Sequence, residues 1–474
     1  MHRLLILFSL TLMVPFTGYA QENLGCSSAV VLNGGTIEVS SSGDGDTENI
    51  QCALDAAVSG GYRDVFLVSN EYEISGLSAK GFVGDLRGTS KAATLVTVSD
   101  GSLACDGAPG VAMEFVVGNV GIRNMSIAVG SPCESGSAAS LVAFYSDPSS
   151  CLANRTVFGN VDRVVMSGLG VDGSDFVVGV TMDSHPDCDP VSEKVLGTLK
   201  VNRSELDNLD YGVLTSIGGG GQVDINYSTF DAVGLPISVI DAFQSTTILE
   251  NTINFNDVAG YESSSGLGTT GVFIASTAAS PTDNATTIKG ANRFIDGGVS
   301  SSGIAVLGGQ TGKSMNHAVV ISGNIFDGSD DNASGSGIAF LDTSNGLVSG
   351  NRFLGTSGVW VDLFSGDPAQ GFLGSVVSGW AVVANNFGTS TAPADISLGE
   401  RTEGNIVGRG QGPAVVIGDT ANNDVLESAS AGSNYFSRAA GSNVSRSPNV
   451  NLDDLFLAQL NTIRGHGKRD AVAR

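Results

Sequence analysis

"ISGNIFDG" at residues 321–328 and "VSGNRFLG" at residues 348–355 are two copies of one pattern, and this pattern decides the fold. In each copy an apolar run ends in Ser-Gly-Asn, and a phenylalanine follows two residues after the asparagine. Weaker copies occur from Val201 onward. The bulky residue recurs at intervals of 24 to 39 residues, at Leu206, Phe230, Phe255, Phe294, Phe326, Phe353 and Phe387.

Short runs of alternating apolar and polar residues flank these motifs. Alternation over four to six residues, bounded by Gly, Asn and Ser, indicates short β-strands. A repeat that holds only short strands cannot bury its apolar face alone, so consecutive copies must stack. The sequence therefore predicts an all-β protein, a single-stranded right-handed parallel β-helix with one repeat per coil. Residues 256–270 and 327–337 are expected to be loops that lengthen two of the repeats.

The asparagines of the motif are predicted to be structural. Stacked at an inward turn, they can hydrogen-bond from side chain to side chain along the helix axis, which satisfies their amides away from water. The phenylalanines are expected to stack in the same way, as offset aromatic layers. The asparagine register comprises Asn292, Asn324, Asn351 and Asn385, with Ser204 and Ser228 at the same place in earlier copies.

The ends of a β-helix expose unpaired strand edges and need caps. Residues 21–63 are predicted to form the first cap, in which Asp46 or Thr47 starts a helix whose apolar face holds Ile50, Ala53, Leu54 and Ala57. The coils are expected over residues 64–427. A Ser/Ala/Asn-rich linker over 428–450 and a C-terminal helix with a mobile tail over 451–474 complete the predicted organisation.

Residues 1–20 have a cationic start, a short apolar core and a small-residue ending, the pattern of a secretory signal cleaved after Ala20. No later stretch is long and apolar enough to span a membrane. The expected product is a soluble, monomeric chain that is secreted or periplasmic. In such a protein an even number of cysteines predicts disulfides, with the connectivity left open. The candidates are Cys26, Cys52, Cys105, Cys133, Cys151 and Cys188.

The composition restricts the partners. Acidic residues outnumber basic ones 48 to 23, for a net charge of −25. A surface of this sign repels nucleic acid and anionic membranes. It also repels polyanionic sugars unless a cation such as calcium mediates.

Three stretches at the start of the expected coils resemble one superfamily. "GDGDTENIQCALDAAV" (43–58), "DVFLVSNEYEISGL" (64–77) and "GDLRGTS" (84–90) are similar to the entry of pectate-lyase-like right-handed parallel β-helix proteins. The resemblance implies the fold and suggests a polysaccharide or cell-surface glycan as partner. It does not specify an activity, because this fold carries lyases, hydrolases, epimerases, tailspikes and non-catalytic binders.

The stretch Val359-Trp360-Val361-Asp362-Leu363 resembles the Val-Trp-Ile-Asp-His motif of pectate lyases, with Leu363 in place of the histidine. By that resemblance Asp342, Asp362 and Asp395 would hold calcium, which acidifies the sugar's C5 proton. Asp362 and Arg352 are the predicted catalytic residues, and Arg401 is an alternative base.

Strand alternation suggests a sugar-binding surface beside this motif. Aligning "GIAVL", "GIAFLD" and "GVWVDL" on their first glycine points Ala305, Ala339 and Trp360 outward, with Phe273 further along the same row. An exposed aromatic side chain beside small residues is suited to stacking on a sugar ring. The alternative is that a loop covers Trp360.

Two further stretches have spacings compatible with metal binding, although a loop is the preferred interpretation of both. They are residues 182–190, with Asp183, His185, Asp187 and Asp189, and residues 327–337, with Asp327, Ser329 and Asp331. The functional hypothesis is an exported protein that binds or processes polysaccharide along a sheet face, with metal-assisted lyase chemistry. The competing hypothesis is a non-catalytic surface or adhesion scaffold.

Overall fold

The structure is a computed structural model of the full chain. Among its described residues, no helix is long and apolar enough to cross a membrane. The described ranges are 24–99, 110–130, 138–148, 157–169, 176–185, 188, 197–216, 221–240, 245–255, 270–275, 284–295, 302–308, 316–328, 336–355, 358–365, 376–390, 392, 394–399, 401–408, 416–418 and 422–426.

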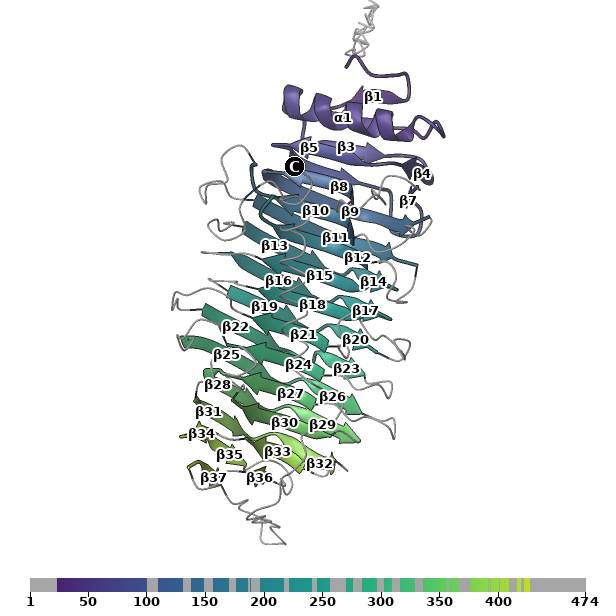
Figure 1. The fold of residues 1–474 in the computed structure, drawn as a ribbon. Coiled ribbons are helices and arrows are strands. Elements are labelled where there is room, and N and C mark those ends of the chain that lie inside the picture. Colours follow the sequence, from purple (N-terminus) through teal and green to yellow (C-terminus); the bar gives the residue numbers. More distant parts are fainter. Residues whose placement is uncertain are drawn as a thin grey trace, which may run out of the picture.

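The described strands form three stacks that run the length of the molecule (Figure 1). Apart from one hairpin at the start, neighbouring strands in each stack are parallel. Stack I is a twelve-stranded sheet in which every neighbouring pair is parallel. Its strands are β5 (Leu77–Lys80), β8 (Gly110–Val116), β10 (Ala138–Tyr145), β12 (Phe176–Asp183), β15 (Tyr211–Ser216), β18 (Leu235–Ile240), β21 (Thr270–Ala275), β24 (Ser302–Leu307), β27 (Ser336–Leu341), β30 (Val359–Phe364), β33 (Ala394–Leu398) and β36 (Val416–Gly418).

Stacks II and III are the two arms of a 25-stranded sheet, joined by the long strands β9 (Gly118–Val129) and β11 (Val157–Ser167), which belong to both. Stack II begins with the antiparallel hairpin of β1 (Val30–Asn33) and β2 (Thr36–Val39). Its other strands are β3 (Asp64–Leu67), β6 (Val83–Arg87), β13 (Gly197–Asn202), β16 (Gln222–Asn226), β19 (Ser245–Leu249), β22 (Asn284–Lys289), β25 (Asn316–Ser322), β28 (Ser344–Ser349), β31 (Val377–Val383), β34 (Thr402–Glu403), β35 (Ile406–Gly408) and β37 (Asp424–Leu426).

One strand from each stack makes one coil. Stack III contributes the short strands, and from β12 to β31 each strand pairs with the one three elements later, as β13 does with β16 and β14 with β17. This confirms the predicted right-handed parallel β-helix. The remaining strands of stack III are β4 (Glu71–Ile74), β7 (Leu95–Val98), β14 (Glu205–Asp207), β17 (Thr229–Asp231), β20 (Thr252–Asn254), β23 (Arg293–Ile295), β26 (Ile325–Gly328), β29 (Arg352–Gly355) and β32 (Asn386–Ser390).

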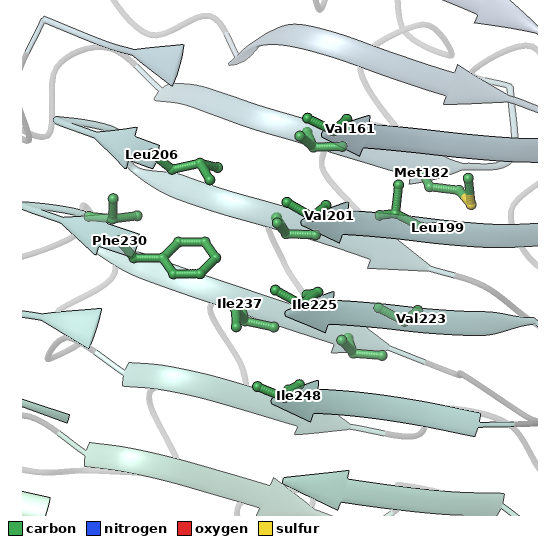
Figure 2. Close-up of a cluster of buried hydrophobic side chains, with 14 of the residues drawn as sticks. Val161, Met182, Leu199, Val201, Leu206, Val223, Ile225, Phe230, Ile237 and Ile248 are labelled. Carbon is green, nitrogen blue, oxygen red and sulfur yellow. The ribbon is translucent and has the colours of Figure 1, made fainter. Parts of the chain in front are cut away.

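The core lies between the three stacks and is built from rows of like side chains. From β9 to β35 one inward row of stack II is entirely β-branched, and its members are fully or almost fully buried. Figure 2 shows Val161, Val201, Ile225 and Ile248 one above another in this row. Branched side chains fill a pleated surface well, which explains why they recur at this position.

The predicted aromatic ladder is present in stack III. The rings of Phe326 and Phe353 lie 4.9 Å apart between centroids, and Phe353 and Phe387 are equally close. One member was assigned wrongly: Ile253, not Phe255, pairs with Phe230 and Phe294. The sequence comparison matched Phe255 to the other phenylalanines because of its large ring. In the structure the turn determines which residue enters the row, and that residue is Ile253, two positions earlier.

The predicted asparagine ladder is also confirmed and is longer than expected. Asn324 donates from Nδ2 to Asn351 Oδ1 at 3.0 Å and to the carbonyl oxygen of Ile288 at 2.9 Å. The same bonds connect the neighbouring coils, and the asparagine side chains are buried. Asn251 is a member that the aromatic misalignment concealed, since it sits two residues before Ile253. The continuous run is Asn251, Asn292, Asn324, Asn351 and Asn385, and Asn405 with Asn423 form a second run.

The turn between stacks II and III requires a left-handed backbone directly before the asparagine. Gly323 and Gly350 have φ of 68° and 65° there, where glycine carries no steric cost. Other coils place larger residues at the same position, including Arg203 at φ 50° and Ala384 at φ 55°. The corner is therefore set by the ladder bonds and does not depend on glycine in every coil.

The cap helix α1 (Asp46–Gly60) covers the first end of the core, as Figure 1 shows. Its predicted apolar face is buried. The expected capping role of Asp46 is wrong, because Gly45 is the N-cap. Asp46 instead accepts bonds from the backbone N–H groups of Ser42 and Glu73, which ties the helix to β4.

A disulfide joins Cys26 to Cys52 and fixes the segment before β1 to α1. Cys188 is also disulfide-bonded. Cys105, Cys133 and Cys151 lie outside the described residues, as do the predicted signal over 1–20, the linker over 428–450 and the C-terminal helix over 451–474. Those predictions stand as made.

Candidate functional site

The predicted exposure of Trp360 is wrong. Its side chain is 3% exposed and belongs to the main core cluster. The indole packs against the Phe353 ring at 5.3 Å between centroids, and its Nε1–H donates to Ser390 Oγ at 2.8 Å. A tryptophan with its ring in the core and its N–H bonded is a packing residue.

The error has a specific cause in the geometry of stack I. Trp360 and the next residue, Val361, both lie in the core, and so do Leu141 and Val142 at the matching place in β10. Strict alternation assumes a straight strand. At this position the strands depart from alternation, and the register aligns Trp360 with Gly337 and not with Ala339. A Cβ on Gly337 would lie 2.9 Å from the Trp360 ring, so the glycine makes room for the indole.

Phe273 does lie in the outward row with Ala305 and Ala339, as predicted, but it is 1% exposed. It belongs to a second apolar cluster on the other face of stack I. The cluster runs from β12 to β30, so this part of the face offers no exposed aromatic surface. Its members are Val178, Tyr211, Leu235, Ile240, Phe273, Ala275, Ala305, Leu307, Ala339, Leu341 and Phe364.

The three predicted calcium ligands do not assemble. Within the described ranges no group of three or more His, Cys, Asp or Glu side chains could hold a metal ion, and Asp342, Asp362 and Asp395 all fall within those ranges. Asp362 lies in the outward row opposite Ala339, whereas Asp395 is opposite the inward Trp360. Asp342 is buried in the turn after β27. The calcium interpretation of these aspartates is therefore wrong.

The predicted base is on another side of the coil. Arg352 is exposed on β29 of stack III, between Ile325 and Asn386, while Asp362 belongs to stack I. Arg401 is exposed in the turn before β34. The structure does not bring the two predicted catalytic residues, Arg352 and Asp362, to one surface.

The loop over 327–337 is described only in part. Asp327 is paired with Arg293 at 3.0 Å, and Ser329 and Asp331 lie outside the described residues. In the stretch 182–190, Asp187 and Asp189 also lie outside them.

Asp183 and His185 contribute to a different group, at the carboxyl ends of the first four strands of stack I. Parallel strands end at the same edge of a sheet, so residues from distant parts of the sequence meet there. In register, Lys80 of β5 aligns with Val116, Tyr145 and then Asp183. The second row holds Ser78 and Glu114. We call Lys80, Glu114, Tyr145, Asp147, Asp183 and His185 the strand-end group.

His185 is the centre of this group. Its Nε2 lies 3.6 Å from Glu114 Oε1, and its ring meets the Tyr145 ring edge-on at 5.6 Å between centroids. Ser78 Oγ donates to the other Glu114 oxygen at 2.8 Å and so orients that carboxylate. The side chains of His185 and Glu114 remain 16% and 26% exposed, which leaves the imidazole and its carboxylate accessible at the surface.

Two further contacts hold the surroundings of His185. Its backbone N–H donates to Ser146 Oγ at 3.1 Å, which attaches the segment after β12 to the end of β10. Lys80 Nζ donates to Asp147 Oδ1 at 2.8 Å, where the carboxylate is buried and the ammonium is half exposed. A charge-assisted bond of this kind positions the ammonium group at the edge of the sheet.

Burial raises the pKa of the Tyr145 hydroxyl well above its ordinary value, and the charges of Asp183 and Glu114 raise it further. The hydroxyl therefore stays protonated at neutral pH and can donate a hydrogen bond. The group thus combines an imidazole, which has both donor and acceptor capacity, with a neutral phenol and a carboxylate.

The sequence alone indicated only Asp183 and His185, as part of a metal site. Lys80, Glu114, Tyr145 and Asp147 were missed because they come from three other strands. Their side chains meet only through the register of stack I, and no local motif marks them.

No protein-family model matches the chain, and no curated protein matches it in sequence. Among solved structures it is similar to the A-module of the mannuronan C-5 epimerase of Azotobacter vinelandii, with a TM-score of 0.47 and 14% identity over 80% of this chain and 95% of that one. It is also similar to the catalytic unit of a GH87 alpha-1,3-glucanase from Streptomyces thermodiastaticus, with a TM-score of 0.45 and 14% identity over 85% of this chain and 71% of that one. The Dettilon tailspike protein has a TM-score of 0.43 and 15% identity over 81% of this chain and 70% of that one. Likenesses at these scores and identities carry no conclusion about activity.

Proposed function

We propose that this protein is exported and acts on a neutral polysaccharide at the strand-end group, with His185 as the proton-transferring group. The observation that carries the proposal is the accessible His185 imidazole, 3.6 Å from Glu114 and in contact with the Tyr145 ring. A carboxylate within reach of an imidazole can orient the ring for proton transfer to or from a bound sugar hydroxyl.

The charge of the site favours a neutral substrate. With His185 neutral, Lys80 contributes one positive charge and Glu114, Asp147 and Asp183 contribute three negative charges, which sum to −2. The whole chain carries −25. A polyanionic sugar would be repelled at this group, whereas a neutral chain of hydroxyl groups can accept and donate hydrogen bonds there.

The scaffold suits a long polymer. Stacked coils present rows of side chains at a constant spacing of about 4.8 Å, and repetitive folds of this kind use such linear surfaces for extended ligands. The Cys26–Cys52 disulfide supports export, because disulfides persist in oxidising compartments.

The test compares the wild type with His185→Gln and Glu114→Gln on a panel of neutral and acidic polysaccharides. Binding is followed by affinity electrophoresis, and turnover by the appearance of reducing ends and unsaturated products, with calcium and with chelator. We expect a neutral polysaccharide to bind and both variants to lose turnover by about 100-fold, the usual contribution of one acid–base group.

Arg352→Gln is the matched control, since Arg352 is exposed on stack III. If His185→Gln retains full turnover, the acid–base role is wrong. If no polysaccharide binds and no product forms, the protein is the non-catalytic scaffold of the competing hypothesis.

A further inference from the structure

Three exposed side chains line up on the corner between stacks II and III. Register places Arg163 of β11, Arg203 after β13 and Tyr227 after β16 directly above one another. All three have left-handed backbones, with φ of 57°, 50° and 55°. This conformation projects the side chains outward from the corner. Half or more of each is exposed: 52% of the Arg163 side chain, 55% of the Arg203 side chain and 53% of Tyr227.

One buried carboxylate holds both arginines. Arg203 bonds to Asp162 Oδ1 through Nε at 2.9 Å and through a terminal nitrogen at 2.6 Å. Arg163 donates from Nε to Asp162 Oδ2 at 3.2 Å. The Asp162 side chain is only 5% exposed, so it fixes the two guanidinium groups from below. A guanidinium carries five N–H donors, and each arginine therefore keeps donors that face solvent.

The charge balance of this corner differs from that of the molecule. At the two arginine coils Arg163 and Arg203 share the carboxylate of Asp162, which leaves an excess of one positive charge there in a chain of net charge −25; the next negative charge of the column is Glu250, one coil beyond Tyr227. The neighbouring Lys91 and Glu205 pair with each other and add no net charge. The column is bounded by Asn124 before Arg163 and by Glu250 after Tyr227.

We propose that Arg163, Arg203 and Tyr227 form a binding site for an anionic sugar, one that carries a carboxylate or sulfate group. The guanidinium donors would bind the oxyanion, a geometry that arginine presents better than lysine. The Tyr227 ring would stack against the apolar face of the sugar ring in the next coil, about 4.8 Å further along. This site is independent of the strand-end group, because it lies on the corner opposite stack I.

The test uses a matched pair of probes, a dextran oligosaccharide and the same oligosaccharide sulfated, in isothermal titration at two salt concentrations. The full-length wild type should bind the sulfated probe more tightly than the neutral one, and the difference should shrink at higher salt. Arg203→Gln should weaken binding about tenfold or more, since it removes charge-assisted bonds. Tyr227→Ser should weaken it several-fold. Tyr227 packs on nothing in the core, so this variant remains informative if Arg203→Gln destabilises the corner.

Arg352→Gln removes an exposed arginine elsewhere on the molecule and should leave binding unchanged. Equal weakening by Arg352→Gln and Arg203→Gln would mean diffuse electrostatic attraction and would overturn the proposal. Equal binding of an oligo-aspartate peptide would exclude a sugar-specific site. Absence of binding to the sulfated probe would also contradict it. His185→Gln serves to separate the two surfaces and should bind the sulfated probe as the wild type does.

Discussion

At the scale of single residues, Trp360 shows why chemical type alone does not locate a site. Strand alternation suggested a sugar platform, yet its neighbours are the Phe353 ring, Ser390 and the space over Gly337. The ladder asparagines, by contrast, were assigned correctly from their residue type and position. Their role followed from the sequence, because a polar residue at a regular position between apolar runs must satisfy its amide within the fold.

We predict that Trp360→Ala lowers the free energy of unfolding by about 3–5 kcal/mol, the usual loss for a buried aromatic side chain. The measurement is chemical denaturation followed by circular dichroism. Trp360→Phe keeps a ring against Phe353 and should lose less. A stable Trp360→Ala protein with impaired polysaccharide binding would contradict the core assignment.

We also predict that Asn324→Ala destabilises the protein by about 2–3 kcal/mol. The substitution removes the bonds to Asn351 and Ile288 and leaves the Ile288 carbonyl buried without its donor. Asn386→Ala is the control, because the side chain of Asn386 makes only an exposed bond to Gly388. Similar denaturation midpoints for the two variants would show that the ladder contributes little.

At the scale of elements, the sequence predicted which strands and which cap helix form, but it did not predict how the strands align with their neighbours. Alternation and turn residues identified the short strands, and spacing identified the cap helix. Register depends on where each turn begins, and a shift of two residues keeps the same face while changing every neighbour. This is why the structure has Ile253, and not the predicted Phe255, in the ladder. The strand-end group was unpredictable for the same reason, since Lys80 and His185 come together only when four strands are aligned.

The first coils are joined by an ion pair whose effect depends on pH. Burial alone would raise the pKa of Asp64, but bonds from Arg87 and Thr36 outweigh it and hold the pKa below its ordinary value. The folded state therefore favours the ionised carboxylate. The stabilisation is complete above the unfolded pKa of about 3.9 and is lost as the pH falls through the lower folded value.

Asp64→Asn should consequently lower stability by about 0.5–1 kcal/mol at pH 7, as expected for a partly exposed pair. The difference from the wild type should disappear near pH 2. Urea denaturation at the two pH values measures both. A difference that persists unchanged at low pH would show that packing, and not charge, is responsible.

At the scale of the whole molecule, the coils are interchangeable units. The buried bonds of each asparagine are made to the coils on either side, and those coils offer the same groups. Solenoid proteins gain stability mainly from such nearest-neighbour contacts. Removing a complete coil should therefore preserve the fold.

Deletion of 292–323 tests this directly. It removes β23, β24 and β25, joins Ala291 to Asn324 and brings β21 against β27, where Gly271 meets Gly337 and Val272 meets Ile338. We expect a folded protein with an unchanged strand-rich circular dichroism spectrum and a moderately lower melting temperature. Deleting 292–308 instead removes only β23 and β24, so that β25 of stack II follows β22 of the same stack, and this should prevent folding; equal behaviour of the two deletions would refute modularity.

The ladders also have a mechanical consequence. Asparagine and phenylalanine columns allow neighbouring coils one arrangement, so the coils provide no second state for a ligand to select. The strand-end group and the arginine corner are therefore isolated from each other: occupying one should leave the affinity of the other unchanged. Cooperation between them requires a single chain long enough to wrap the molecule and touch both.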